Sequence, residues 1–366
     1  MFVFGSIPSR RLGRSLGVNN VPPKTCSYSC IYCQLGRTIK PVISRRAFYS
    51  PDKILEDAVR RVDEAGLRSE RIDYITFVPD GEPTLDANIG REISLLKQMG
   101  IPIAVLSNAS LLWREDVAED LLEADLVSLK VDASDGPLWR RINRPYKGLR
   151  LDLILDGIRR FAERFKGRII SETMLIDGIG YRGELEGIAR FLEGLKKLDK
   201  AYIAVPTRPP SEKWVKPARE ETVNLAYRIF SGRLGMDRVE LLTGYEGDAF
   251  SLAGDVKEGL LDILAVHPMR IGAVEKLLGE SGKDWRIIEE LLRKGEIIKV
   301  EYEGNEYYAR KTKYGRTGWG SGSPLQASPR RRRQGKVQRD RSERSASAQR
   351  ERRFHAGGGY LKSLRH

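Results

Sequence analysis

The three cysteines of this chain lie together as Cys26-x-x-x-Cys30-x-x-Cys33, and the sequence contains no other cysteine. An odd cluster of cysteines cannot close a disulfide framework, whereas thiolates are the usual ligands of iron–sulfur clusters. Three thiolates would hold a four-iron cluster and leave one iron without a protein ligand. The spacing therefore predicts a [4Fe–4S] cluster on this loop, with the chemistry at its open iron.

Two alternatives for these cysteines are a structural zinc site and a set of buried thiols. A structural zinc site takes four ligands, and His267 is the only histidine before the C-terminal tail. His267 lies far from the cysteines in the sequence, in a segment that we expect to form another domain. The spacing, the aromatic Tyr32 and the strand expected before the loop favour the iron–sulfur interpretation.

The elements that must position this loop alternate in type between Leu16 and Leu242. Short apolar runs, which we expect to be strands, alternate with amphipathic helical patterns. The expected strands are 72–78, 101–106, 126–131, 169–175, 201–205 and 239–242, and the clearest helical patterns are 151–165, 184–195 and one that starts at Ser50-Pro51-Asp52. This alternation predicts an α/β fold, a partial (β/α)6 barrel over residues 1–245, with its working residues at the C-terminal ends of the strands.

Polar motifs follow or end five of these strands. They are Asp80-Gly81-Glu82-Pro83, Ser107-Asn108, Lys130 with Asp132, Glu172-Thr173, and Thr207-Arg208. Any one of them could belong to an ordinary polar loop, but five at one rim of a barrel indicate a site. Because side chains alternate along a strand, Lys130 and Asp132 should point to the same face.

The cysteine spacing, Tyr32 and the preceding strand resemble the signature of the radical S-adenosylmethionine (SAM) enzymes. Within that superfamily, residues 8–17 and 22–26 are similar to an archaeal and bacterial group that is grouped with the wyosine synthases. The resemblance covers about residues 2–245. It implies that the open iron binds SAM, and that an electron from the reduced cluster cleaves SAM to methionine and a 5′-deoxyadenosyl radical, which takes a hydrogen atom from the substrate.

The resemblance also implies which residues bind this cofactor. Gly81-Glu82-Pro83 resembles the Gly-Gly-Glu-Pro motif, whose backbone and carboxylate receive the methionine ammonium, and Asp80 stands where the first glycine is usual. Ser107 and Asn108 would hydrogen-bond the ribose or the carboxylate of SAM. Their alternative role is to cap the helix that follows.

Charged side chains near the same rim have two interpretations each. Lys130 and Asp132 either meet the cofactor or an anionic substrate, or form an ion pair inside the barrel. Arg10, Arg11 and Arg14 lie just upstream of the first expected strand. They are candidates for contacts with substrate or a carboxylate. Alternatively, they are ordinary surface arginines exposed to solvent.

The sequence excludes several other classes of protein. It contains no phosphate-binding Gly-x-x-x-x-Gly-Lys-Ser/Thr loop and no Gly-x-Ser-x-Gly elbow. No segment is apolar and long enough to cross a bilayer, and the first residues lack a signal peptide. Free thiols without an export signal lead us to expect a protein of the reducing cytoplasm.

The net charge of +14 comes almost wholly from the C-terminal tail. Residues 311–366 hold 16 Lys and Arg against 3 Asp and Glu, which leaves a net charge of +1 for the rest of the chain. The tail is rich in Arg, Ser and Gly and poor in apolar residues, so we expect it to be disordered. It either binds RNA phosphates or is a dispensable extension.

Residues 257–310 have a different pattern from the barrel. Helices are expected at 257–266, 271–278 and 284–294, followed by strands at 297–302 and 306–310 around a hairpin turn. Three helices and a two-stranded wing are typical of a winged helix-turn-helix domain. Ten basic and eleven acidic residues between Lys257 and Lys311 make it neutral, which favours contact with protein, peptide or folded RNA over duplex DNA.

We therefore expect a radical SAM oxidoreductase that acts on a macromolecular substrate, either tRNA or a peptide. Its electron donor would be a protein of the flavodoxin or ferredoxin type. The alternative from another class is a non-catalytic regulator, in which the cluster senses redox state and the winged helix binds DNA. A sensor has no need of the cofactor motifs, so the enzyme is favoured.

Overall fold

A sheet of eight strands forms the centre of the computed structural model, which describes residues 2–181, 183–244, 247, 250 and 255–311. The strands are β1 (Val3–Ser9), β2 (Gly13–Val18), β3 (Tyr74–Phe77), β4 (Ile103–Ser107), β5 (Leu126–Lys130), β6 (Arg168–Met174), β7 (Leu198–Ala204) and β8 (Val239–Leu242), adjacent in that order. β1 is antiparallel to β2, and every neighbouring pair from β2 to β8 is parallel. This arrangement confirms the predicted α/β fold with a partial barrel.

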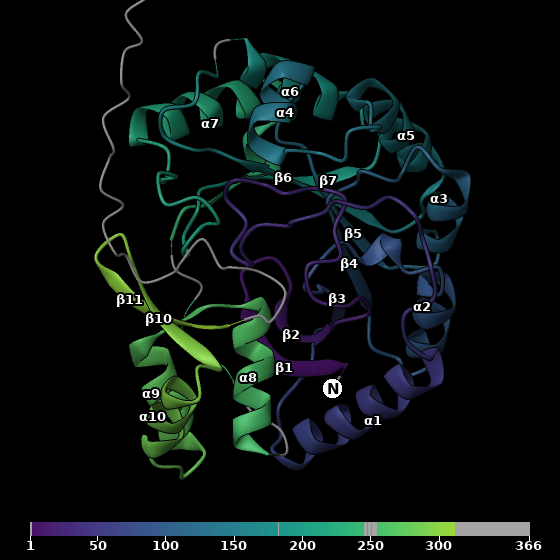
Figure 1. The fold of residues 1–366 in the computed structure, drawn as a ribbon. Coiled ribbons are helices and arrows are strands. Elements are labelled where there is room, and N and C mark those ends of the chain that lie inside the picture. The colour runs from purple at the N-terminus through teal and green to yellow at the C-terminus, as the bar shows by residue number, and fades with distance from the viewer. Residues whose placement is uncertain (1, 182, 245–246, 248–249, 251–254, 312–366) are drawn as a thin grey trace, which may run out of the picture. The chain divides into compact units, whose positions relative to one another are not determined.

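Helices connect the parallel strands and lie around the outside of the sheet (Figure 1). They are α1 (Pro51–Leu67), α2 (Ile89–Lys97), α3 (Glu115–Leu121), α4 (Gly136–Asn143), α5 (Leu151–Arg164), α6 (Glu184–Glu193) and α7 (Glu220–Leu234), with short 3-10 turns η1 (Pro83–Leu85) and η2 (Met236–Arg238). α1 begins at Pro51 as predicted, although the Ser50 side chain makes no capping bond. In the described part of the chain, no helix is long and apolar enough to cross a membrane.

Alternation along the strands separates an outer core from the barrel interior. Val105 and Ile203 belong to the large cluster that includes residues of the helices, whereas Ala104, Ile170 and Tyr202 belong to a smaller cluster together with Leu12 and Leu242. The two sets follow the two-residue period of a strand. Continuing the inner set toward the strand ends reaches Lys130 and Glu172, so the fold directs these charged side chains inward.

The N-terminal hairpin differs from the expectation for this region. The first strand was expected near Leu16, with the arginines upstream of it, but β1 precedes β2 and pairs with it. Arg10 and Arg11 therefore lie in the turn between two strands, and Arg14 lies within β2. The prediction failed because glycine and proline interrupt the apolar pattern of residues 3–9, which contains an irregular pairing step between Phe4 and Ile7.

The segment after residue 255 has the elements that the sequence predicts. α8 (Val256–Val266), α9 (Ile271–Glu280) and α10 (Arg286–Arg293) are followed by β10 (Ile297–Tyr302) and β11 (Asn305–Arg310), and a short β9 (Met269–Arg270) adds a third strand to their sheet. These elements enclose a core of their own, which also contacts Ile7 of β1. That they form a winged-helix domain remains a prediction. The expected disordered tail lies outside the described residues, apart from Lys311.

Candidate active site

The cysteine loop lies between β2 and α1 and is held by segments that follow other strands. The backbone N–H of Ile31 donates to the carbonyl of Ile142, at the end of α4, over 2.9 Å. The hydroxyl of Ser211, which follows β7, donates to the carbonyl of Cys30 over 2.8 Å. The loop is therefore anchored to the C-terminal side of the barrel, where the polar motifs were expected to gather.

Nitrogen donors lie close to each of the three sulfur atoms. The amides of two asparagines and one ammonium group contribute, and a backbone N–H adds a fourth donor. The contacts are Asn108 Nδ2 and Tyr28 N to Cys26 Sγ at 3.5 Å each, Asn143 Nδ2 to Cys30 Sγ at 3.5 Å, and Lys24 Nζ to Cys33 Sγ at 3.7 Å. Hydrogen bonds to sulfur stabilise thiolate charge and tune the potential of a bound iron–sulfur cluster.

The donor set of this loop fits an iron–sulfur cluster. The three thiols are free, and burial raises the pKa of Cys26 and Cys30 to about 12 in the metal-free protein. Those protons must leave when a metal binds. Among the described residues, no three His, Cys, Asp or Glu side chains are grouped as a site for a single metal ion. A four-iron cluster spreads its thiolates over separate corners, so three thiols on one loop suit it without converging on one point.

Backbone contact joins the cysteine loop to the Gly81-Glu82-Pro83 loop. The N–H of Glu82 donates to the carbonyl of Thr25 over 2.9 Å, and the N–H of Lys24 donates to the carbonyl of Asp80 over 2.7 Å. A Cβ added at Gly81 would lie 1.9 Å from the carbonyl oxygen of Thr25. Only glycine allows this approach, so the two predicted cofactor motifs form one packed unit.

The carboxylate of Glu82 accepts four hydrogen bonds from the protein itself. Its Oε1 accepts from the N–H and hydroxyl of Thr84 at 3.2 and 2.7 Å and from the hydroxyl of Ser107 at 2.7 Å. Its Oε2 accepts from the N–H of Asn108 at 2.7 Å. Burial raises the pKa of Glu82, while these hydrogen bonds oppose the rise. The carboxylate thus ties the end of β3 to the end of β4, and Oε2 keeps room for one further donor.

Ser107 and Asn108 do not cap a helix, as one interpretation allowed. The next helix, α3, begins at Glu115 with Arg114 as its capping residue. The Asn108 amide instead donates to the Ser27 hydroxyl over 2.9 Å and to Cys26. The two residues therefore connect the Glu82 carboxylate to the cysteine loop.

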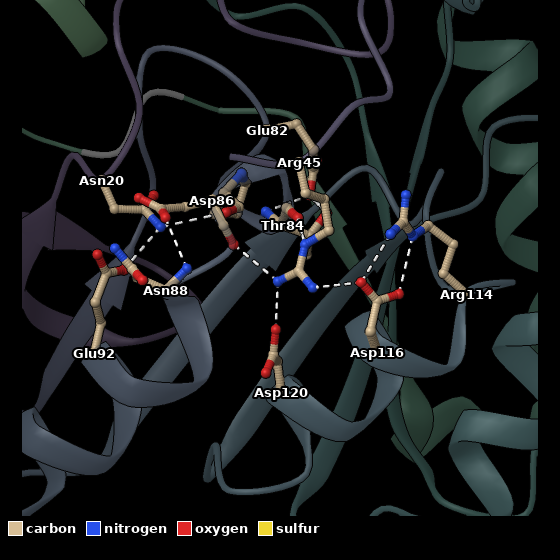
Figure 2. Close-up of polar contacts among 11 residues, drawn as sticks. Asn20, Arg45, Glu82, Thr84, Asp86, Asn88, Glu92, Arg114, Asp116 and Asp120 are labelled. Carbon is tan, nitrogen blue, oxygen red and sulfur yellow. Dashed lines mark hydrogen bonds and ion pairs between the residues drawn. The ribbon is translucent and has the colours of Figure 1, made fainter. Parts of the chain in front are cut away.

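A second buried network supports the loop after Glu82 (Figure 2). The Arg45 guanidinium donates to the carbonyls of Thr84 and Asp86 at 2.9 and 2.8 Å and pairs with Asp116 and Asp120 of α3. The Arg45 side chain is only 7% exposed. This guanidinium therefore connects the loop after Glu82 to α3.

Of the two roles considered for Lys130, the structure shows the ion pair, and its contact with the cofactor or an anionic substrate remains a prediction. Its ammonium pairs with Glu172, lies 3.8 Å from Asp132 and sits over the Tyr32 ring, 4.8 Å from the ring centre. It is thus an ion-pair partner inside the barrel, and it also lines the cavity described below. Glu172 pairs in addition with Arg11 of the β1–β2 turn.

Asp132 is buried and accepts hydrogen bonds from the cysteine loop, α4 and β6. Its Oδ2 accepts from the Tyr32 hydroxyl and from the Asn143 amide, the latter at 2.7 Å, and its Oδ1 accepts from the N–H of Met174 at 2.8 Å. The side chain has no exposed surface. Asp132 therefore orients the residue before Cys33, and its predicted contact with the cofactor remains untested.

A cavity of about 320 Å³ lies beside the cysteine loop. Its wall includes inner-face residues of the strands, such as Thr76, Leu106, Lys130 and Glu172, together with Tyr32, Cys33 and Gln34. Val266 and His267, at the end of α8, complete the wall, so His267 is near Cys33 in space although far in sequence. Apolar walls with a few charged groups are typical of small-molecule sites.

Sequence reasoning missed several residues of this site. Asn143 lies at the end of α4, where an asparagine reads as an ordinary helix terminus. Arg45 lies in an irregular loop with no pattern around it. Gln34 directly follows Cys33, and its amide donates to the Val266 carbonyl over 2.8 Å while its oxygen accepts from Arg208 at 3.3 Å. Only the position of Gln34 beside a predicted ligand could have indicated its role.

Comparison with known proteins agrees with these features. A model of the radical SAM superfamily matches residues 20–192. A UPF0026 protein of Methanocaldococcus jannaschii is 46% identical over 312 residues, which are 85% of this chain and 96% of that protein. A UPF0026 protein of Helicobacter pylori is 33% identical over 225 residues, 60% of this chain and 70% of that protein.

The solved structures that the chain matches include radical SAM proteins. A radical SAM methyltransferase from Sphaerobacter thermophilus has a TM-score of 0.48 at 16% identity, covering 63% of this chain and 66% of that one. TYW1 with a lysine-pyruvate adduct bound has a TM-score of 0.44 at 17% identity, and the match covers 60% of this chain and 73% of that one. With the superfamily match and the M. jannaschii relative, the cysteine loop and the partial barrel lead to one conclusion: the chain belongs to the radical SAM superfamily, and within it to the family of the UPF0026 proteins.

Proposed function

We propose that this protein is a radical SAM oxidoreductase that reductively cleaves S-adenosylmethionine and abstracts a hydrogen atom from a substrate. One observation carries the proposal. Three free thiols share a loop at the C-terminal side of a partial barrel, and the third of them, Cys33, lines a cavity at the ends of the strands. Cofactor and substrate would thus meet where α/β barrels place their chemistry.

Cys26, Cys30 and Cys33 would hold a [4Fe–4S] cluster, and Gly81, Glu82 and Pro83 would receive SAM with Ser107, Asn108 and Lys130 nearby. When bound and reduced, the cluster supplies the electron that converts SAM to methionine and a 5′-deoxyadenosyl radical. The family membership supports this chemistry. A flavodoxin- or ferredoxin-type protein would deliver the electron.

The residues of the chain would hold these partners and exclude water. Glu82 and Asn108 fix the distance between the motif loop and Cys26 through the hydrogen bonds described above. Asp132 holds the Tyr32 ring next to Cys33, and the apolar wall of the cavity keeps solvent away from a reactive radical. Because the cofactors would carry out the bond cleavage, few side chains of the protein need to transfer protons.

The proposed substrate is macromolecular, either tRNA or a peptide. The similarity to the wyosine-synthase group favours tRNA, and the neutral segment from residue 257 to 310 favours a protein or peptide. The alternative of a non-catalytic DNA-binding regulator gains little support from that neutral segment. Purified tRNA and candidate peptides, each tested for formation of a modified product with SAM and dithionite, would separate the two substrates.

The proposal is tested by anaerobic reconstitution with iron and sulfide. We expect about four irons per chain in the parent protein and a spectrum that changes when SAM is added. Under reduction, 5′-deoxyadenosine should form, and Cys30→Ala should abolish it. A chain that takes up stoichiometric zinc and no iron when isolated without oxygen would establish the zinc alternative instead.

A further inference from the structure

The turn between β1 and β2 brings two arginines to the cavity beside Cys33. Arg10 and Arg11 both belong to its wall, and Leu12 continues into the core of the barrel interior. The hairpin geometry is demanding, because Gly13 has a positive φ and a Cβ there would lie 2.4 Å from the Asp73 carboxylate. The turn thus has a defined conformation that presents two guanidinium groups to a cavity.

The charges in the cavity wall are unequal. Arg10, Arg11, Lys130 and Arg208 line it, and the only carboxylate among the described lining residues is Glu172. Arg11 and Lys130 share that carboxylate, and Asp132 behind the wall lies 3.8 Å from Lys130. These four groups balance one another, so the charges of Arg10 and Arg208 add to an already neutral network.

One buried hydrogen-bond donor on the same turn lacks a protein acceptor in the described part of the chain. Arg11 Nε is buried and has no partner among the described residues. Arg10 is exposed, and its charge acts on Glu172 from the cavity wall. A buried donor without an acceptor is costly, and a bound acceptor would remove the cost.

Positive side chains around the cavity keep the buried carboxylate of Glu172 ionised. Although burial raises its pKa, the charges of Lys130, Arg11 and Arg10 hold the pKa of Glu172 at about 2. Because Glu172 already offsets Arg11 and Lys130 together with Asp132, the charge of Arg10 at the wall is available to attract a second anion. SAM as a whole is a cation, because it carries a sulfonium and an ammonium against a single carboxylate. A net anion in the cavity would therefore come from the substrate.

We infer that the cavity binds an anionic group of the substrate, a carboxylate or a phosphate, through Arg10 and Arg11. The inference rests on the proposed function, which it extends by naming the chemical class of the substrate. Guanidinium groups bind either anion through paired N–H donors. Arg10 contributes the unbalanced charge and Arg11 contributes the buried Nε.

The test measures anion binding by calorimetry on the full chain, reconstituted without oxygen, with and without SAM. Inorganic phosphate and malonate are the two probes, so that phosphate and carboxylate chemistry are distinguished. Arg10→Gln should weaken binding of the preferred probe at least about fivefold. Arg11→Lys, which keeps a cation beside Glu172 but loses Nε, should weaken it less.

Arg14→Gln is the matched control. Arg14 belongs to the same hairpin but pairs with Glu70 and does not line the cavity, so its variant should bind within about twofold of the parent. The Arg-rich tail is present in every variant, so anion binding there does not distinguish them.

Preference for phosphate, or for malonate, supports the inference and assigns the substrate class. If Arg10→Gln binds both probes as the parent does, or if it weakens SAM binding and leaves the probes unaffected, the inference is overturned. Iron content and 5′-deoxyadenosine formation of the parent are measured on the same samples. If the parent protein holds iron and forms 5′-deoxyadenosine but binds neither anion, the inference is refuted and the proposed function stands. If the parent holds no iron, the proposed function is refuted.

Discussion

The buried carboxylate of Glu82 allows a quantitative test of how the site is assembled. Glu82→Ala removes the acceptor of two hydroxyls and of the backbone N–H groups of Thr84 and Asn108. The hydroxyls can rotate toward other acceptors, but the two N–H groups are fixed by the backbone. Each buried donor left without a partner costs about 1 to 3 kcal/mol, so we expect a loss of roughly 2 to 6 kcal/mol in the free energy of unfolding.

The measurement is urea unfolding followed by circular dichroism, on protein without iron so that cluster binding does not contribute. The control is Glu119→Ala, which removes an exposed carboxylate that pairs with Arg164 on the helix surface. Exposed ion pairs contribute about 1 kcal/mol or less, so the control should unfold close to the parent.

Glu82→Gln separates charge from shape in the same assay. In the variant, the amide keeps one acceptor oxygen, but its NH₂ group replaces the other oxygen and faces the donors that this oxygen accepted from in the parent. We therefore expect a loss in the free energy of unfolding that is intermediate between those of the parent and Glu82→Ala. SAM affinity of the reconstituted variants should fall in the same order. If Glu82→Ala unfolded within about 0.5 kcal/mol of the parent, the carboxylate would not join the strand ends, and the argument would fail.

Three other predictions follow from the contacts of the site. Gly81→Ala should lower the unfolding temperature and SAM affinity, because its Cβ meets the Thr25 carbonyl at 1.9 Å, whereas Gly180→Ala, with no atom within 4 Å, should do neither. Burial, with Asp86 nearby, raises the pKa of Glu92 from 4.5 to about 8. The unfolded chain therefore releases this proton first, and the parent should lose stability relative to Glu92→Gln as pH rises from about 4.5 to 8; urea midpoints showing the opposite trend would contradict it. Removing residues 312–366 should leave iron content and SAM cleavage unchanged while abolishing most salt-sensitive RNA binding in filter assays; retained tight binding would refute the assignment of that affinity to the tail.

The strands from β3 to β8 could be predicted from the sequence to within a few residues, because each is an apolar run between turn signals. β4, expected at 101–106, spans Ile103–Ser107, and β5, expected at 126–131, spans Leu126–Lys130. The hairpin of β1 and β2 could not be predicted in the same way. Glycine and proline interrupt the apolar pattern of residues 3–18. The two strands are therefore recognised only from their pairing with each other.

The sequence predicts that the polar motifs lie together at the C-terminal ends of the strands, but it does not predict their hydrogen-bond partners. Strand parity directs Lys130 inward, as expected from its position on β5. Asp132 follows the end of that strand, where the period no longer applies, and its carboxylate turns to Tyr32 and Asn143. For Glu82, the motif predicts a ligand and the structure shows four protein donors. Which donors reach a carboxylate depends on how loops from separate strands pack, and no local pattern contains that information.

The wall of the cavity has a consequence for the order in which the protein is made. Its lining runs from Phe4 to His267, and Gln34 beside the last cysteine is bonded to the carbonyl of Val266. A ribosome therefore completes the cysteine loop more than two hundred residues before it supplies the residues that close the cavity. During that interval the thiols face an unfinished wall, so a protein that delivered the proposed cluster would reach them from a side that the residues around Val266 later line.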